Sequence, residues 1–127
     1  ELRWLEYGQR LLAQARNVSA SSDSPHTGTR LLNKVLEGGA NALGTKVGKI
    51  ASGYIADILM LDSFSSHLYG KSLCDIFNAL IFSGNSNMVR DVICCGDWVV
   101  QDFRHKHEEA ITANYFRTLD RLHVRCH

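Results

Sequence analysis

The sequence predicts an α/β fold in which four helices are combined with about three strands. Two patterns support this prediction: apolar side chains recur at helical spacing in four segments, and a β-branched apolar run and a hairpin lie among them. The length of 127 residues allows one domain with a modest core. A complete (β/α)₈ barrel does not fit, because such a barrel needs roughly 200 residues or more.

The composition argues against three classes of protein: nucleic-acid binders, membrane-spanning proteins and disulfide-rich secreted proteins. The chain has 14 Lys and Arg against 13 Asp and Glu, and this net charge of +1 argues against a dedicated nucleic-acid binder. No apolar run approaches the ~18–20 residues that span a bilayer. The 4 cysteines form no Cys-x-x-Cys pair, so reduced thiols in a cytoplasmic protein are a better interpretation than a secreted disulfide framework.

The first predicted helix covers residues 4–18. Its apolar stripe runs at helical spacing from Trp4 through Leu11 to Val18. The polar stretch 19–29, which contains the single proline, follows as a loop. We expect this stripe to be covered by a part of the protein outside this chain, and to form an exposed patch in the chain alone.

The second predicted helix begins with Thr27 or Thr29 as its cap and ends at Gly44. Gly38 and Gly39 interrupt it, and a glycine inside a helix costs about 1 kcal/mol relative to alanine. Close packing against another backbone would offset that cost, so we expect a helix crossing there. The apolar stripe consists of Leu32, Val35, Leu36 and Leu43.

Three strands are predicted in the second half of the chain. The apolar run 54–62 reads as the first strand. Segments 89–95 and 98–101 flank a two-residue turn at Gly96-Asp97 and predict a β-hairpin. Such a small apolar sheet is a poor stand-alone structure, so these strands are expected to need partners that this chain does not supply.

Two further helices complete the pattern. Ser72 with Asp75 three residues later resembles a capping box for a short helix. Its apolar residues are Leu73, Ile76, Phe77, Leu80 and Ile81. The last helix is predicted from about His107, with a stripe formed by Ile111, Tyr115, Leu119 and Leu122.

A His-x-His motif, His105-Lys106-His107, is the strongest candidate for a metal site. On a strand, both imidazoles of such a motif point the same way and could bind zinc. A catalytic zinc site needs about three protein ligands, and no third ligand is evident nearby. Glu108 and Glu109 are better explained as acids that favour a helix N-terminus. A solvated turn is the favoured interpretation.

The neighbouring thiols Cys94 and Cys95 are a second candidate, as a redox or metal-binding pair. In a predominantly apolar strand, however, cysteines more often behave as small buried hydrophobic residues. Alternation along the strand would also place the two side chains on opposite faces. We therefore favour the buried interpretation.

The remaining polar clusters have ordinary structural explanations. The aspartates are expected to bond to nearby backbone or to lie on the hairpin surface, no serine sits in a nucleophile elbow, and the glycines match no phosphate loop. The sequence therefore predicts no catalytic, cofactor-binding or metal-binding residue in this chain. The residues considered are Asp57, Asp62, Asp91, Asp97, Asp102, Ser63, Ser65, Ser66, His67, Gly44, Gly48, Gly53, His123 and His127.

Two stretches resemble the C-terminal signature of the amidohydrolase superfamily. The first consists of Ala42-Leu43-Gly44 followed by residues 47–62, which fit the pattern G-x-I-x-x-G-x-x-A-D-h-h-h-h-D, where h is apolar. The second, residues 89–102, is similar to the hairpin that ends those enzymes. Within the superfamily, the chain resembles the formimidoylglutamate deiminases of histidine degradation, through residues 2–11, 15–18, 72–75, 80–84 and 104–105.

The resemblance implies a fold. It makes the chain the C-terminal fragment of a metal-dependent (β/α)₈ barrel hydrolase, with part of the composite β-sandwich that both chain ends build. Residues 1–45 would be the last helices of the barrel domain, residues 46–102 the C-terminal strands of the sandwich, and residues 103–127 a C-terminal helix. The apolar strands would then find their partners in the missing N-terminal portion.

The resemblance also implies an activity. The complete enzyme would be a zinc-dependent cytoplasmic hydrolase that converts N-formimidoyl-L-glutamate to N-formyl-L-glutamate and ammonia. It would have no nucleic-acid or membrane partner, and the resemblance is compatible with a homodimer. No position in this chain matches a catalytic or metal-binding residue of the family, so we expect the chain alone to be inactive. The alternatives are another deaminase of the superfamily, of guanine or aminoadenosine type, or a non-catalytic scaffold or interaction module.

Three departures from the family pattern stand out. Ser52 occupies a position where the family often has proline, and the pair Cys94-Cys95 replaces a more usual small or polar pair. Phe103 stands where glycine commonly follows Asp102. We expect Phe103 to disturb a turn that prefers positive φ.

Overall fold

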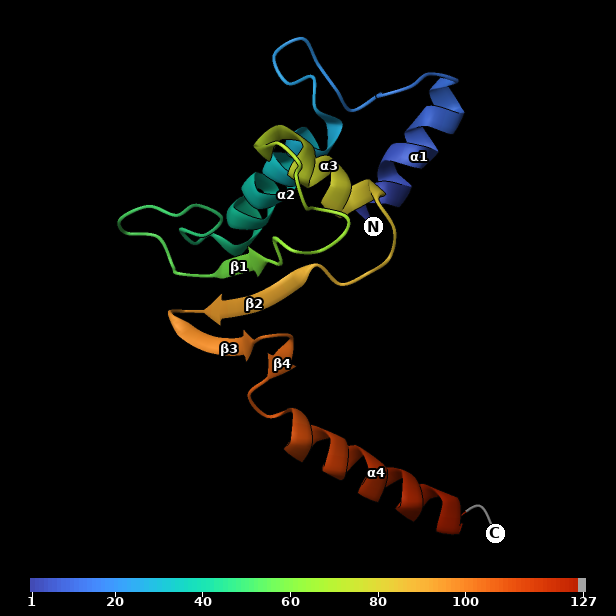
Figure 1. Ribbon diagram of the computed structural model, residues 1–127, viewed down its shortest axis with the longest axis vertical. Coiled ribbons are helices and arrows are strands. Elements are labelled where there is room, and N and C mark those ends of the chain that lie inside the picture. Colours follow the sequence, from blue (N-terminus) through green and yellow to red (C-terminus); the bar gives the residue numbers. More distant parts are fainter. Residues whose placement is uncertain (126–127) are drawn as a thin grey trace.

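The computed structural model describes residues 1–125, which form four helices and one four-stranded sheet. Three helices gather beside one edge of the sheet, and the fourth extends away from the rest of the molecule (Figure 1). The predicted α/β class is confirmed. In chain order the elements are α1 (Leu2–Ala13), α2 (Thr27–Leu43), β1 (Ile58–Leu61), α3 (Leu73–Phe82), β2 (Val89–Cys94), β3 (Asp97–Gln101), β4 (Arg104–His105) and α4 (Glu108–Arg125).

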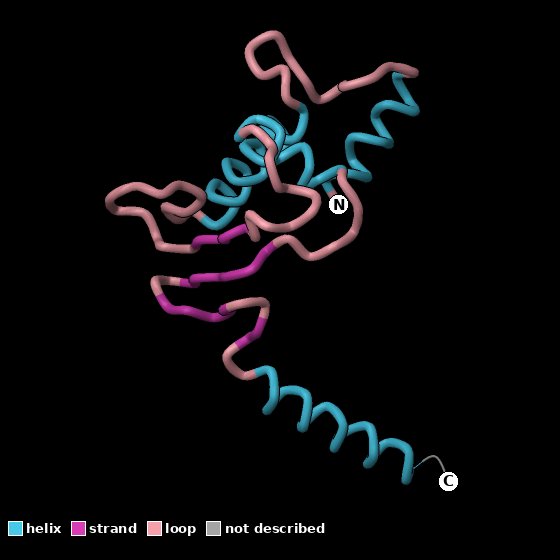
Figure 2. The backbone as a smooth tube through the Cα atoms, viewed as in Figure 1, coloured by secondary structure: helices cyan, strands magenta, loops and turns pink. Residues whose placement is uncertain are grey.

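The sheet is an antiparallel meander in which the strand order follows the chain, β1-β2-β3-β4 (Figure 2). Ile58 of β1 lies opposite Ile93 of β2, and Leu59 lies opposite Val92. Val92 also lies opposite Val100 of β3, so β2 is the central apolar strand. The short strand β4 was not predicted, and it raises the number of strands from about three to four within the described residues.

Two tight turns join the last three strands. Cys95 and Gly96 have φ angles of 51° and 88°, and Asp102 and Phe103 have φ angles of 47° and 65°. Positive φ at both central residues is typical of the turns that match the twist of a hairpin. The first turn lies one residue earlier than the predicted Gly96-Asp97. The second is the turn at which Phe103 was expected to disturb the geometry, and it forms nonetheless, with Phe103 at positive φ.

Strand β1 is shorter than the predicted strand 54–62. The backbone N–H groups of Tyr54 and Ile55 donate to carbonyl groups of the preceding loop, at 3.1 and 2.8 Å, instead of to a neighbouring strand. β1 therefore begins only at Ile58.

The capping box predicted for α3 is confirmed. The Ser72 hydroxyl accepts a hydrogen bond from the Asp75 N–H at 3.3 Å and donates one to the Asp75 carboxylate at 2.7 Å. These bonds satisfy an N-terminal N–H group that the helix itself leaves unpaired. α3 begins directly afterwards, at Leu73.

Helices α2 and α3 cross at Gly28. A Cβ atom added there would lie 2.6 Å from the backbone N of Asn78 and 2.7 Å from the carbonyl carbon of Phe77. The Gly28 N–H also donates to Asn78 Oδ1 at 2.7 Å. The crossing predicted at Gly38 and Gly39 is wrong, because nothing lies within 4 Å of a Cβ at either position.

The core is small for a chain of this length. Leu68, Ala79 and Met88 form one buried cluster between α3, the loop before it and the start of β2. Leu31 of α2 and Ile81 of α3 are also buried. Few large apolar side chains besides these are shielded from solvent, so most predicted apolar faces have no cover in this chain.

The apolar stripe of the first helix is uncovered in this chain, as expected, but the helix is shorter than predicted. α1 ends at Ala13 because Gln14 adopts a left-handed conformation with φ 49°, so the helix does not reach residue 18. Trp4 and Leu11 of the predicted stripe are 79% and 80% exposed, whereas Glu6 is fully buried. α1 thus turns a charged side chain inward and its apolar stripe outward.

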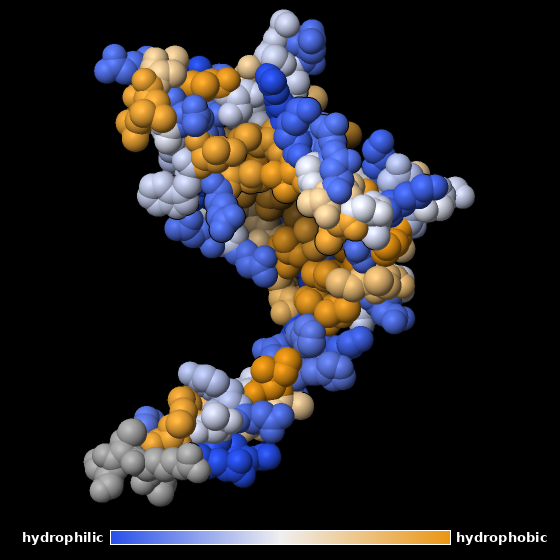
Figure 3. Space-filling view, turned by 180° about the vertical axis from the view of Figure 1, so that it is seen from behind, coloured by the Kyte–Doolittle hydropathy of each residue, from blue (hydrophilic) through white to orange (hydrophobic). Residues whose placement is uncertain are grey.

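The stripes of α2 and α4 are also largely exposed. His26, and not Thr27 or Thr29, occupies the N-cap position of α2, while Gly44 ends the helix as predicted. Seen from behind, apolar side chains line a hollow in the upper part of the molecule (Figure 3). None of the helices in the described part of the chain is long and apolar enough to cross a membrane. The exposed stripe residues are Val35, Leu36, Leu43, Ile111, Tyr115 and Leu122.

Candidate functional site

The most enclosed charged group is the carboxylate of Glu6 on α1. Its oxygens accept hydrogen bonds from Arg10 Nε at 2.7 Å, from the Val18 N–H at 3.1 Å and from the Ser19 N–H at 3.0 Å. Glu6 therefore binds the loop after α1 to the helix. Sequence reasoning missed this role, because Glu6 and Arg10 four residues later look like an ordinary surface pair.

These contacts set the protonation state of Glu6. Burial raises the pKa of its carboxyl, but the hydrogen bonds from Ser19 and Arg10 outweigh burial and hold the pKa below the ordinary value of 4.5. Glu6 is consequently a carboxylate whose lone pairs are committed to the protein. Such a group acts as a structural anchor and not as a general base.

A second set of contacts joins α1 to the end of α3. Arg3 Nε donates to the carbonyl of Ile81 at 2.7 Å, and Nη1 donates to Asn85 Oδ1 at 2.8 Å. Nη2 donates to the Gly84 carbonyl. The arginine thus satisfies carbonyl groups at a helix C-terminus, where a positive charge is also favoured by the helix dipole.

Aromatic rings extend this contact between α1 and α3. The rings of Tyr7 and Phe82 stack with centroids 5.9 Å apart. The Arg10 guanidinium lies 5.4 Å from the Tyr7 centroid and 5.6 Å from that of Phe82, within the range of cation–π attraction. Arg10 therefore links the Glu6 anchor to this aromatic pair.

The sheet contains one buried carboxylate, that of Asp91 on β2. It accepts a hydrogen bond from the Asp102 N–H at 2.8 Å and one from Arg90 Nε at 2.8 Å. The bond from Asp102 and the neighbouring Arg90 lower the pKa of Asp91. Asp91 was expected on the hairpin surface and is instead buried, where it holds the turn between β3 and β4.

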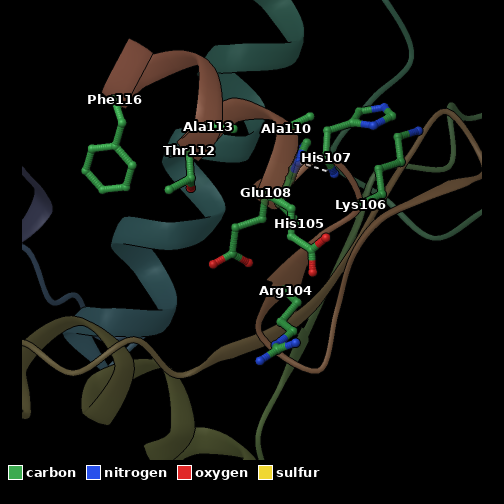
Figure 4. A pocket seen from close by; sticks show the side chains of 10 residues that line it. Arg104, His105, Lys106, His107, Glu108, Ala110, Thr112, Ala113 and Phe116 are labelled. Carbon is green, nitrogen blue, oxygen red and sulfur yellow. Dashed lines mark hydrogen bonds between the residues drawn. The ribbon is translucent and has the colours of Figure 1, made fainter. Parts of the chain in front are cut away.

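An open pocket of about 810 Å³ lies where β4 passes into α4 (Figure 4). His105 and His107 line it, with ring centroids 5.7 Å apart. The His107 N–H donates to Nδ1 of His105 at 3.1 Å, so the neutral His105 ring carries its proton on Nε2. The other lining residues are Arg104, Lys106, Glu108, Glu109, Ala110, Thr112, Ala113 and Phe116.

This pocket does not fit a catalytic metal. One nitrogen of His105 is already engaged by backbone, and the described residues contain no group of three His, Cys, Asp or Glu side chains that could hold an ion. Catalytic zinc sites use three protein ligands.

The other predicted polar residues lie apart from one another. Asp57 accepts the Cys95 N–H at 2.8 Å, as expected for a group that bonds to backbone. Asp62 accepts the Phe64 N–H at 3.0 Å. His67 Nε2 lies 3.5 Å from the Ser86 hydroxyl, and the His67 backbone N–H donates to the Ser65 hydroxyl at 3.4 Å. The structure does not bring these residues together.

The interpretation of the cysteine pair as buried is wrong. Cys94 and Cys95 are both exposed and free: Cys95 belongs to the turn, and Cys94 is the exposed last residue of β2. His123 lies on α4. Its predicted neighbour His127 and the fourth cysteine, Cys126, lie outside the described residues.

Comparison with known proteins identifies the family. The sequence profile of the amidohydrolase family matches residues 4–99, which is most of the chain. The chain belongs to the amidohydrolase family. The resemblance found in residues 42–62 and 89–102 is thereby confirmed.

Individual amidohydrolases align over different shares of the chain. A formimidoylglutamate deiminase from Pseudomonas aeruginosa is 42% identical over 122 residues, 96% of this chain and 27% of that protein. A 5-methylthioadenosine/S-adenosylhomocysteine deaminase from Thermococcus onnurineus is 38% identical over 64 residues, 50% of this chain and 15% of that protein. A solved structure of an amidohydrolase from Brucella melitensis matches with a TM-score of 0.77 at 31% identity, over 96% of this chain and 26% of that one.

The chain thus spans about a quarter of the length of the formimidoylglutamate deiminase and of the solved amidohydrolase. Amidohydrolases are generally metal-dependent, and the described residues supply no ligand set for a metal. What this part of the amidohydrolase shows is a set of anchors, at Arg3, Glu6 and Asp91, that hold helices and turns in place.

Proposed function

We propose that this chain is the C-terminal part of a formimidoylglutamate deiminase, which hydrolyses N-formimidoyl-L-glutamate to N-formyl-L-glutamate and ammonia in histidine degradation. The observation that carries the proposal is the extent of the alignment. Similarity to the Pseudomonas deiminase continues over 96% of the chain, whereas five adenosine-type deaminases align over 50–66% of it. The matched helices, loops and hairpin therefore favour the deiminase over its relatives.

The same proposal assigns each segment of the chain to a domain of the complete enzyme. Residues 1–45 would be the last helices of a (β/α)₈ barrel, residues 46–102 strands of a composite β-sandwich, and residues 103–127 a helix on its outside. The exposed stripe of α1, from Trp4 to Leu12, supports this arrangement, because an apolar patch of this kind is typical of an interface. The missing barrel portion would be the partner that covers it.

Zinc would be held by residues that this chain does not contain. The described residues do not form a metal site, so the contribution of this chain is to position the barrel wall and close the sandwich. Arg3 and Glu6 carry out that positioning for α1, through its contacts with α3 and with the following loop. We further propose a cytoplasmic location, a small-molecule substrate and no nucleic-acid or membrane partner.

The decisive experiment assays the complete protein on two substrates. Release of ammonia from N-formimidoyl-L-glutamate, with no turnover of guanine, is expected. Turnover of guanine alone would overturn the proposal. Because five adenosine-type deaminases also match the chain, S-adenosylhomocysteine and 5′-deoxyadenosine belong in the same assay as a second candidate substrate class.

A second experiment uses the 127-residue chain alone. We expect no deiminase activity and no stoichiometric zinc after dialysis, because two histidines without a third ligand do not make a tight site. The metal content of the purified chain is the measurement. Stoichiometric zinc that disappears when His105 and His107 are replaced by alanine would contradict this expectation. An upstream reading frame without a barrel would support the alternative of a non-catalytic interaction module.

A further inference from the structure

The tip of the β2–β3 hairpin carries a chemical feature that the proposed deiminase reaction does not use. Cys94 and Cys95 are consecutive, both are exposed and neither forms a disulfide. Cys74 at the start of α3 is exposed as well, but it has no neighbouring thiol in the sequence. The hairpin tip therefore differs from the other described cysteine site in offering two sulfurs at once.

The backbone at the tip allows the two thiols to converge. Consecutive Cα atoms lie about 3.8 Å apart across a trans peptide bond. In a regular strand the two side chains would point to opposite faces, but Cys94 is the last residue of β2 and Cys95 has a left-handed φ of 51°. Strand alternation thus ends at Cys94, and both short side chains are exposed, which leaves χ1 of each free to turn its sulfur toward the other.

The same tip is held rigidly from two sides. The Cys95 N–H donates to Asp57 Oδ1 at 2.8 Å, and the Gly96 N–H donates to the carbonyl of Ala56 at 3.0 Å. On the other side, Cys94 pairs with Asp97 in the β2–β3 ladder. A pair of ligands fixed on a rigid backbone loses little conformational freedom on binding, which favours a chelated ion.

We propose that Cys94 and Cys95 form a dithiol site that binds a trivalent arsenical through both sulfurs. Thiolate ligands are selective for soft ions of this kind. With an aryl arsenoxide, two S–As bonds form and the arsenic–oxygen bond breaks. The two thiol protons leave with that oxygen as one water molecule. Arsenic stays trivalent throughout, so the step needs no oxidant or reductant.

The test exposes the complete protein to phenylarsine oxide and measures the intact mass after washing with excess 2-mercaptoethanol. We expect one adduct at this site that withstands the monothiol and is removed by 2,3-dimercaptopropanol. Cys94→Ser and Cys95→Ser should each abolish that adduct, because a single S–As bond is exchanged by the monothiol. Cys74→Ser and Cys126→Ser are the matched controls and should keep it.

Two results would overturn the proposal: an adduct that the monothiol removes from the unmodified protein, or a resistant adduct that persists in both Cys94→Ser and Cys95→Ser. Thermal unfolding of each variant checks that the hairpin still folds, and Cys95→Gly provides a second variant suited to the left-handed turn. Arsenical binding is measured by mass alone. Its failure is therefore distinct from failure of the proposed deiminase activity.

Discussion

At Glu6, three N–H groups converge on a carboxylate that has no exposed surface. Two of the donors belong to the backbone of Val18 and Ser19, so the carboxylate closes the loop that follows α1. A lost partner in such a cluster costs more than an average hydrogen bond is worth, because the remaining groups stay desolvated. Glu6 therefore holds the loop after α1 against the helix, while Arg3 and Tyr7 hold the helix against α3.

We predict that Glu6→Gln destabilises the complete protein by about 1–3 kcal/mol, because the amide NH₂ cannot accept from the donors that surround it. The pKa of Glu6 is lowered in the folded state, so its stabilising contribution is present above the ordinary value of 4.5 and is lost as the pH falls through the folded pKa. The difference between the two proteins should accordingly shrink under acid. Urea unfolding at neutral and acidic pH measures both effects.

Glu37→Gln is the matched control. Glu37 pairs with Lys34 on the exposed face of α2, with its side chain 62% exposed, and a surface pair of this kind contributes little. We expect little change in the free energy of unfolding, because solvent screens an exposed pair. Equal losses in the two variants would refute the anchoring role of Glu6.

Phe103 occupies a left-handed conformation with φ 65°, where the family commonly has glycine. A left-handed residue other than glycine costs roughly 1–2 kcal/mol, and part of this is offset by the greater freedom of glycine in the unfolded chain. Phe103→Gly should therefore stabilise the protein by about 0.5–1 kcal/mol. In the neighbouring strand, Gln101→Gly should instead destabilise it, and a melting temperature that moves the same way for both would contradict this prediction.

At the scale of elements, the crossing of α2 and α3 depends on the absence of a side chain at Gly28. A Cβ there would lie 2.6 Å from backbone, which does not yield as a flexible side chain does. We predict that Gly28→Ala separates the two helices and destabilises the protein by about 1–3 kcal/mol or more. The measurement is denaturant unfolding of the complete protein.

The opposite result is expected at Gly38 of the same helix. No atom lies within 4 Å of a Cβ there, so Gly38→Ala gains helix propensity at no steric cost. The expected gain is up to about 1 kcal/mol. If Gly38→Ala were the more damaging substitution, the crossing described for α2 would be in the wrong place.

Local signals in the sequence predicted the elements well. Ser72 and Asp75 define the start of α3 because a capping box acts within four residues, and Gly44 ends α2 because its left-handed φ is a local property. Gly28 and Gly38 could not be told apart in this way. Which glycine faces another backbone depends on the arrangement of α2 and α3, and a single sequence carries no record of that arrangement.

Burial was harder to predict than secondary structure, and most of the wrong predictions concern residues of the candidate site. Glu6 and Asp91 gave no signal, because their donors are backbone N–H groups that converge only after the chain folds. Cys94 and Cys95 were assigned to a strand, and the shift of the turn by one residue reversed their exposure. By contrast, the bond from Asp57 to backbone followed from its place beside the strand.

At the scale of the whole molecule, apolar surface without cover is the dominant feature. Trp4, Leu11, Leu12 and Leu73 are each about four-fifths exposed, while the buried apolar core is small. Patches of this kind mark interfaces or lead to aggregation. The outer edge of β1 adds unpaired backbone groups that can pair with another chain.

We therefore predict that the isolated 127-residue chain is oligomeric, aggregated or molten, and that it becomes soluble when co-expressed with the missing N-terminal portion. Sedimentation and thermal unfolding of the two preparations measure this directly. A monodisperse monomer with a sharp, cooperative transition would show that the chain closes its own core. Replacing Trp4 and Leu11 by polar residues should reduce the association if the α1 stripe causes it.

The order of the strands in the sheet also bears on how the molecule assembles during synthesis. Strands β2, β3 and β4 are joined by tight turns, so their pairings are local and form quickly once they leave the ribosome. β1 is synthesised earlier, but it cannot pair until β2 has been made. Likewise, the contact of Gly28 with α3 cannot form until α3 has been made. We expect the most recently made strands to nucleate the sheet, and the older segments to dock onto it afterwards.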